Sequence, residues 1–227
     1  MSQIAARSTD STRSQAWGTT RALLACGAIA GPLFIVVVFI QIPLRTGFDW
    51  VRHPLSMLSL GDAGWIQVAN FILCGGLFIA GAVGLRRVLR GGPAATWGPL
   101  LIAGLGFGLI VGGLFSADPG LGFPPGAPAG QPTSMSWHSG LHLTGFGIGF
   151  ISLIAGAFVF ARRDWKLGRR AWAVYCIASG LLVAACFAIV MSGLTHQNLL
   201  PLYLALVAGW VWASVMPARA LATEGNA

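Results

Sequence analysis

The sequence predicts an all-α integral membrane protein, a bundle of six transmembrane helices with the N and C termini in the cytoplasm. The prediction rests on the composition, on six long apolar stretches and on the distribution of positive charge. Of the 227 residues, 56% are hydrophobic and only 9% are charged, which leaves too little polar surface for a soluble globular protein.

Six apolar stretches are each about the ~20 residues that a helix needs to cross the ~30 Å hydrocarbon layer of a bilayer. They predict helices rather than barrel strands, because runs such as 34–40 are continuously apolar and do not alternate at a period of two. The transmembrane domain is expected at 21–217, between a disordered cytoplasmic tail at 1–20 and a cytoplasmic tail at 218–227. The predicted spans are residues 22–42, 64–85, 97–115, 141–161, 171–191 and 199–216.

Positive charge is confined almost entirely to one side of the predicted bundle. Of the 14 Lys and Arg residues, all but Arg45 and Arg52 lie in the tails or in the segments that follow the second and fourth spans. The positive-inside rule places this side in the cytoplasm, so we expect a plasma-membrane protein whose histidine-containing loops are extracytoplasmic. The cations form short clusters at helix ends, so the net charge of +8 indicates contact with membrane lipids rather than nucleic acid.

Small residues recur at helical spacing on two of the predicted spans. Gly104, Gly108 and Gly112 share one face of the third span, and Gly145 and Gly149 share one face of the fourth. Such faces let helix backbones approach closely in lipid, so we expect tight packing here and association into a homo-oligomer through these faces. The four cysteines lie within spans and lack CxxC spacing, which is typical of apolar packing residues rather than disulfides or a zinc ribbon.

The loop before the second span contains a short apolar segment between Pro54 and Gly61. Proline suits the first turn of a helix and glycine its end, so we expect a short helix at the membrane interface. Asp62 is then a candidate N-cap for the second span. Gln67 and Asn70 follow on one face of that span and are expected to point into the bundle.

All four histidines lie on the side with little positive charge. His138 and His142 are four residues apart at the start of the fourth span, a spacing that places both on one helix face, as in helical zinc sites. A catalytic zinc needs about three protein ligands and an open position for water. His53 or His196 would supply the third ligand, and zinc is the cofactor that this set would hold.

An aspartate and a serine on the same side of the membrane would complete, with the histidines, the groups needed for zinc-dependent hydrolysis. Zinc lowers the pKa of its bound water to roughly 7, and Asp118 would act as base or orient a histidine ligand. Ser56 would polarise a substrate carbonyl or position the water. This hypothesis predicts hydrolysis of a lipid-like amide or ester at the extracytoplasmic face, and it leaves open whether the protein is an enzyme.

Two other functions stay open. Histidine is also comfortable at headgroup depth, and the chain would then be a non-enzymatic membrane module that binds lipid headgroups or a partner protein. Arg45 and Arg52 are candidates for contact with a lipid phosphate, with an ion pair to nearby Asp49 as the alternative. A small-solute transporter is the third hypothesis, which the absence of charged residues at mid-membrane depth disfavours.

Several short motifs are spread along the chain: His53-Pro54-Leu55-Ser56, Leu58-Ser59, Gly61, Gly64-Trp65-Ile66-Gln67, Asn70-Phe71, Phe115, Asp118-Pro119, His138 and His142. Through these residues the sequence resembles the bacterial "domain of unknown function 998" membrane proteins. That resemblance covers nearly the whole chain after residue 20 and implies six helices in the plasma membrane with no settled activity. A looser resemblance links His138, His142, Asp118 and Ser56 to alkaline ceramidase-like membrane hydrolases, which implies a three-histidine zinc site with an Asp and a Ser nearby.

Overall fold

The computed structural model describes residues 2–194 and 198–224, with side chains for residues 17–194 and 198–223. In this part of the chain the regular structure is helical, and six helices are long and apolar enough to cross a membrane. The predicted fold class, a six-helix multi-pass membrane protein, is confirmed. The elements are α1 (Ser2–Leu44), η1 (Leu55–Ser59), α2 (Gly64–Val88), α3 (Ala94–Leu114), α4 (Trp137–Lys166), α5 (Arg170–Met191) and α6 (Leu200–Glu224).

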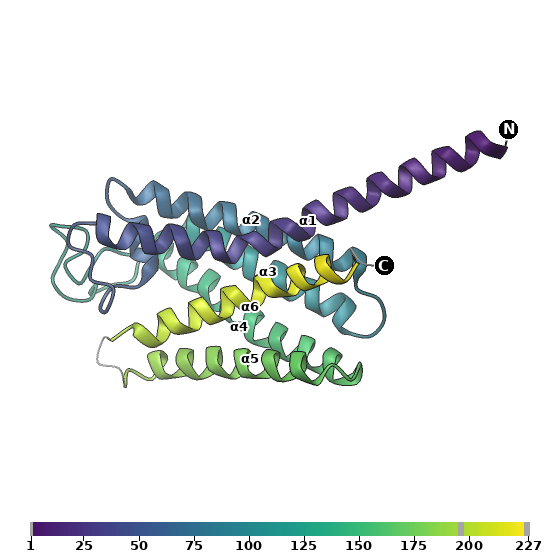
Figure 1. Ribbon diagram of the computed structural model, residues 1–227. Helices are drawn as coiled ribbons and strands as arrows, with labels where there is room; N and C mark the ends of the chain where they lie inside the picture. The colour runs from purple at the N-terminus through teal and green to yellow at the C-terminus, as the bar shows by residue number, and fades with distance from the viewer. Residues whose placement is uncertain (1, 195–197, 225–227) are drawn as a thin grey trace.

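The helices extend beyond several of the predicted spans. Helix α4 covers Trp137–Lys166 where the apolar stretch covers 141–161, and α6 continues through much of the expected tail at 218–227. Hydropathy detects only the apolar part of a helix, whereas Arg, Lys and Ala are good helix formers that continue it into the headgroup region. Helix α1 begins at Ser2, and its first part projects beyond the bundle (Figure 1).

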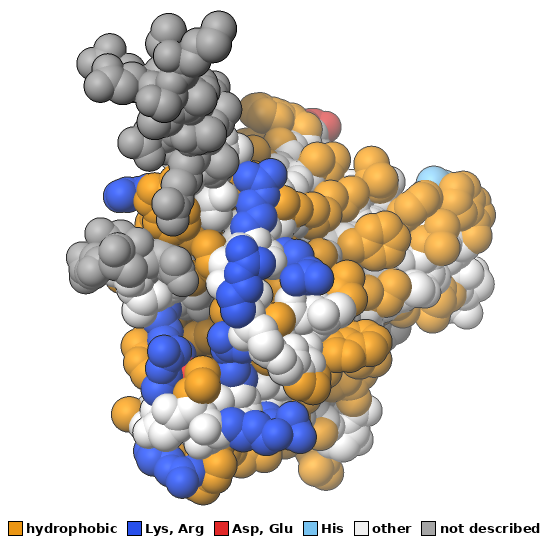
Figure 2. Space-filling model, turned by 90° about the vertical axis from the view of Figure 1, so that its right-hand side faces the viewer, with side chains coloured by type: hydrophobic (Ala, Val, Ile, Leu, Met, Phe, Trp, Pro, Cys, Tyr) orange, Lys and Arg blue, Asp and Glu red, His pale blue; other side chains and the backbone are white. Residues whose placement is uncertain are grey.

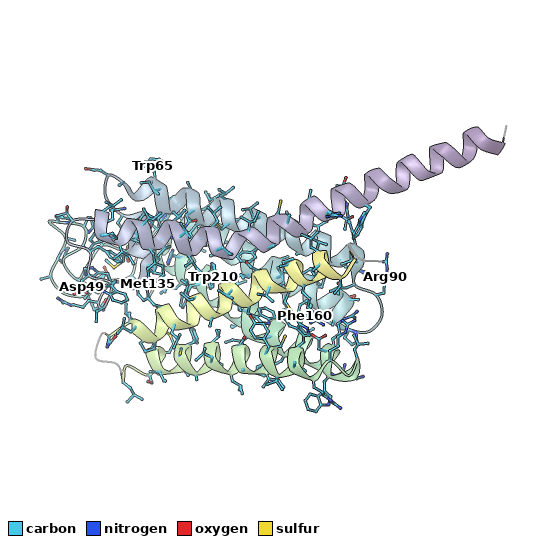
Figure 3. The ribbon with its side chains drawn as sticks, in the orientation of Figure 1. Asp49, Trp65, Arg90, Met135, Phe160 and Trp210 are labelled. Atoms are coloured by element: carbon cyan, nitrogen blue, oxygen red, sulfur yellow. The ribbon has the colours of Figure 1, made fainter. Side chains whose placement is uncertain are left out.

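The six helices form a ring in chain order. Each helix from α1 to α5 packs against the next, and α6 closes the ring by packing against both α5 and α1. The end of α6 therefore lies at the same end of the bundle as the segments 89–93 and 167–169, which we call the basic end (Figure 1). The opposite end carries the segments 45–63 and 115–136 and is called the loop end. Arg90 marks the basic end in Figure 3, and Asp49 and Met135 mark the loop end.

The glycine stripes of α3 and α4 pack against each other within one chain. A Cβ atom on Gly108 would lie 2.4 Å from the carbonyl oxygen of Gly145, and one on Gly104 would lie 2.4 Å from Oγ of Ser152. Only glycine permits this separation, so the expected tight packing is confirmed. Within one chain, each of these two helix faces covers the other. Homo-oligomer formation through them stays a prediction.

At the basic end, α4 and α6 are joined by a buried ion pair. The Arg219 guanidinium donates to both carboxylate oxygens of Asp164, at 2.6 and 2.7 Å, and Asp164 is only 2% exposed. Arg219 also lies over the ring of Trp172, 4.3 Å from its centroid. The pair fixes the end of α6 against α4, and the sequence contains no local pattern that identifies these two residues as partners.

At the loop end, the predicted short helix is present as the 3₁₀ helix η1. Its side chains Leu55, Met57 and Leu58 are buried, so it packs on the bundle. The N-cap of α2 is Ala63, with no side-chain cap hydrogen bond, so the prediction that Asp62 is the N-cap was wrong.

The polar face expected near the start of α2 is buried, as predicted. Gln67 is 0% exposed and accepts a hydrogen bond from Gln41 of α1 at 2.8 Å. Asn70 donates to the carbonyl oxygen of Phe34, 3.2 Å away. Because α1 and α2 share these amide hydrogen bonds inside an otherwise apolar interface, their relative position is fixed beneath the loop end.

Candidate functional site

Two adjacent cavities lie beneath the loop end. The larger, the loop-end cavity, has a volume of about 390 Å³ and lies between η1, the segment 117–135, the first turns of α4 and the neighbouring ends of α5 and α6. It brings together four residues that the sequence singled out. These are Arg52, Ser56, Asp118 and His142.

The smaller cavity, the inner cavity, has a volume of about 70 Å³ and lies deeper in the bundle. Its walls are largely apolar and include Trp210, which Figure 3 places in the middle of the bundle. Nε1 of Trp210 is buried without a hydrogen-bond partner among the described residues. The two cavities share the lining residues Pro54, Ser56, His142, Phe146 and Leu202.

His142 lies at the boundary of the two cavities and caps the end of α3. Its Nδ1 is 2.8 Å from the carbonyl oxygen of Phe115 and 3.1 Å from that of Gly112, two carbonyls at the C-terminal end of α3. Carbonyl oxygens only accept hydrogen bonds, so Nδ1 carries the proton and the lone pair of the neutral ring is on Nε2. Nε2 has no partner in the described part of the chain, so His142 is a fixed acceptor beside both cavities.

His138 does not join His142 in the cavity. Its ring packs against that of Trp137, with the centroids 3.5 Å apart and the planes tilted by 33°, and the side chain is exposed. His142 is one turn deeper and turned toward α3 by its two carbonyl acceptors. The i, i+4 spacing therefore places the two imidazoles on similar sides of α4, but packing against different neighbours separates them.

His53 joins the two long segments of the loop end. Its Nδ1 accepts from the backbone N–H of Asp49 at 2.9 Å, so Nε2 is the protonated nitrogen and donates to the carbonyl oxygen of Leu121 at 3.0 Å. The hydroxyl of Tyr203 donates to the carbonyl oxygen of His53 at 3.1 Å. The ring is 3% exposed and packs beside Phe123. Both nitrogens are already engaged, so in this arrangement His53 offers no lone pair to a metal.

Asp118 lines the loop-end cavity, but its carboxylate is hydrogen-bonded to Ser136 at the start of α4. The Ser136 side chain and then the Ser136 backbone N–H hydrogen-bond to this carboxylate and lower the pKa of Asp118. The hydroxyl of Ser136 in turn accepts from the N–H of Ser139 as the N-cap of α4. A carboxylate with a lowered pKa is a weak general base, so these contacts favour a structural role in which Asp118 holds Ser136, the N-cap of α4.

The two arginines of the loop end have different environments. Arg45 donates to the backbone carbonyls of Leu58, at 2.7 Å, and Leu60, and its guanidinium lies over the ring of Phe123. Arg52 is exposed and lines the loop-end cavity, and its side chain has no hydrogen bond or ion pair in the described part of the chain. Of the two candidates for contact with a lipid phosphate, Arg52 is the one whose guanidinium is not engaged by backbone carbonyls of the described residues.

The described residues contain no group of three His, Cys, Asp or Glu side chains arranged to hold a metal ion. His196, the remaining candidate ligand, lies outside the described residues. Zinc binding therefore stays a prediction, and among the described histidines only His142 combines a free ring nitrogen with a place in the cavity.

Sequence reasoning missed the inner cavity and its tryptophan. The available signal was the same glycine periodicity that predicted close packing, because Gly108, Gly112, Gly145 and Gly149 also line the inner cavity. Where two facing helices both carry glycine, no side chain fills the interface. The helix backbones then either touch or leave a cavity between them. Which one results depends on the distance between the helices, and the sequence does not contain that distance.

Comparison with known proteins identifies a family. Residues 28–219 match the family described as Protein of unknown function (DUF998). Neither the curated proteins nor the solved structures contain a match to the chain. The matched range begins within α1, ends within α6 and includes every described residue of the candidate site. Because the match covers well over half of the sequence, the protein belongs to the DUF998 family, a multi-pass membrane family of unknown function.

Proposed function

We propose that the loop-end and inner cavities together bind one lipid-like amphiphile taken from the bilayer. The observation that carries this proposal is the adjacency of two cavities that share five lining residues, the loop-end cavity having several polar side chains in a largely apolar lining and the inner cavity being more uniformly apolar. The polar groups Arg52, Ser56 and His142 would contact the headgroup, and the inner cavity would hold part of an apolar chain. By the positive-inside rule, this site belongs to the extracytoplasmic leaflet.

The rim of the loop-end cavity supports entry from the membrane. Met135, Leu143 and Met191 line the cavity, and they are 64%, 48% and 60% exposed. They come from the segment before α4, from α4 itself and from the last residue of α5. Exposed apolar side chains at the ends of membrane-spanning helices favour acyl chains over water, so an amphiphile can enter without exposing its chain to solvent.

The length of the inner cavity suits a chain that runs along α4. Its lining extends from His142 to Phe150 on that helix, and eight residues correspond to about 12 Å at 1.5 Å per residue. Apolar residues and glycines dominate this stretch, while polar side chains cluster at the His142 end. A ligand with a polar end and a single extended apolar chain matches this arrangement.

Filling the inner cavity tests the proposal. The Cβ of an alanine or larger residue at Gly149 has only Leu105 within 4 Å, at 3.7 Å, so Gly149→Leu is expected to fold and to extend into the cavity. A fatty acid carrying a diazirine, incorporated in phosphatidylcholine vesicles, should crosslink to cavity-lining peptides of α4 and α6 in the wild type. We expect crosslinking at these peptides to fall about tenfold in Gly149→Leu, a loss of about 1.4 kcal/mol in binding.

Gly147→Leu is the matched control, because a Cβ at Gly147 meets nothing within 4 Å and the same side chain is added two residues away. This variant should crosslink like the wild type. Equal crosslinking of cavity peptides in wild type and Gly149→Leu, with both proteins monodisperse and helical by circular dichroism, would contradict amphiphile binding in the inner cavity.

A second candidate function is hydrolysis of the bound amphiphile. It is favoured by a ring nitrogen and a hydroxyl group beside the cavities that have no hydrogen-bond partner among the described residues. Nε2 of His142 has a lone pair, and Oγ of Ser56, which lines both cavities, has no hydrogen bond in the described part of the chain. His142 would take a proton from water or from Ser56 as the oxygen bonds to an ester or amide carbonyl carbon. The same proton would then pass to the leaving oxygen or nitrogen as its bond to that carbon breaks.

The variant His142→Asn distinguishes a catalytic role of His142 from a structural one. His142→Asn keeps an N–H near the position of Nδ1 for the carbonyls of α3 but removes Nε2, so it should retain the fold and lose hydrolysis of p-nitrophenyl butyrate by about 10²-fold or more. His138→Asn should hydrolyse like the wild type, because His138 does not line the cavity. Wild-type hydrolysis by His142→Asn would exclude His142 as the base. Zinc content measured by mass spectrometry on the same samples separates a metal-dependent reaction from a metal-free one.

A further inference from the structure

A separate pocket of about 280 Å³ lies at the basic end, where α4 ends beside the segment that joins α2 to α3. We call it the basic pocket. Four of its lining residues are cationic, and no acidic residue is among the lining residues that the structure describes. Figure 2 shows Lys and Arg side chains gathered over this end of the molecule. The four cations are Arg90, Arg162, Arg163 and Lys166.

Most of the positive charge in the basic pocket is unpaired. Nη1 of Arg163 donates to the carbonyl oxygens of Arg90 and Gly91, both at 3.0 Å, which holds the α2–α3 segment against α4. Arg90, Arg162 and Lys166 have no side-chain hydrogen bond or ion pair in the described part of the chain. The neighbouring carboxylate, Asp164, faces a different pocket and is paired with Arg219. The basic pocket therefore has several free donors directed at one site and lacks an internal counter-ion.

The location of the basic pocket decides what kind of anion is available. It lies between the last turns of α4 and the start of α3, two helices that cross the membrane, so it is at the depth of the lipid headgroups. Val159 adds an apolar wall on the membrane side of the cations. Gly91 and Gly92 have φ of +67° and +72°, and a Cβ on either would meet nothing within 4 Å, so the α2–α3 segment leaves the site open.

We propose that the basic pocket binds the phosphate group of an anionic membrane lipid. Arg162 and Lys166 would contact the phosphate, Arg90 would close the site from the α2–α3 segment, and an acyl chain would follow α4 past Val159. Basic pockets between transmembrane helices bind anionic headgroups through the same charge complementarity. This site is at the opposite end of the bundle from the loop-end cavity and is independent of the function proposed there.

The test compares two double variants that remove the same charge from the same end. Arg162→Gln/Lys166→Gln removes two pocket cations, and Arg86→Gln/Arg87→Gln removes two exposed cations that do not line the pocket. Binding of phosphatidylglycerol and phosphatidylcholine with equal acyl chains is measured by native mass spectrometry in mild detergent, with inorganic phosphate as the soluble anion. We expect the pocket variant to bind phosphatidylglycerol about tenfold more weakly than the wild type, and the control variant to change less than twofold.

Three results would overturn the proposal. Equal losses in the two double variants would show a general effect of surface charge. Equal affinity of the wild type for phosphatidylglycerol and phosphatidylcholine would show that the pocket does not select a net negative lipid. Displacement of phosphatidylglycerol by millimolar inorganic phosphate, with phosphate itself bound to the wild type and lost in the pocket variant, would identify a site for a soluble anion.

Discussion

Asp164→Asn is expected to lower the free energy of unfolding by about 3–5 kcal/mol, because it leaves the partly buried Arg219 guanidinium without its counter-ion. Asp164 is 2% exposed and accepts two hydrogen bonds from Arg219. The asparagine has nearly the same shape, so the loss reports charge and hydrogen bonding rather than a cavity. Equilibrium unfolding in mixed micelles of a mild detergent and dodecyl sulfate would measure it.

A double-mutant cycle identifies the cause of this loss. Asp164→Asn/Arg219→Gln removes both charges, so it should destabilise by less than the sum of the two single variants. Arg86→Gln is the surface control. Arg86 is exposed and has no ion pair among the described residues, so this change should stay within about 0.5 kcal/mol. Additive losses at Asp164 and Arg219 would contradict a direct coupling between α4 and α6.

Gly108→Ala is expected to lower the free energy of unfolding by about 1–3 kcal/mol, although alanine is the better helix former. The new Cβ would lie 2.4 Å from the carbonyl oxygen of Gly145 and 2.8 Å from the backbone nitrogen of Gly149. Both are backbone atoms, so α3 and α4 must move apart. The same movement would disturb the contact of His142 with the end of α3, one turn beyond Gly108. The same micellar unfolding experiment measures the loss.

Gly147→Ala controls for helix propensity, since it makes the same change in α4 where a Cβ meets nothing within 4 Å. It should leave stability unchanged or raise it by up to about 1 kcal/mol, the usual advantage of alanine over glycine in a helix. A destabilised Gly147→Ala, or a Gly108→Ala variant as stable as the wild type, would show that close contact of α3 and α4 is not what glycine provides at position 108.

The membrane-spanning architecture could be predicted because it depends on local properties of the chain. Each apolar stretch must form a helix in lipid to satisfy its own backbone hydrogen bonds, whatever its neighbours are. The short helix η1 could be predicted from the local preferences of Pro54 and Gly61. The burial of Gln67 and Asn70 could be predicted because exposing their amide groups to lipid is unfavourable. Helix ends were predicted less well, as at Trp137, because polar residues continue a helix without an apolar signal.

The candidate site depended on tertiary contacts that no local pattern contains. By itself, the sequence determined the six helices, the close-packing glycines and the concentration of histidines at the loop end. The tertiary structure decided which of the described histidines has a free ring nitrogen beside the cavity, because the state of each ring nitrogen depends on its hydrogen-bond partner. His53 has both nitrogens hydrogen-bonded, Nδ1 within its own loop and Nε2 to the second loop, and His138 packs against Trp137 outside the cavity. His142 keeps Nε2 free because the end of α3 accepts from Nδ1.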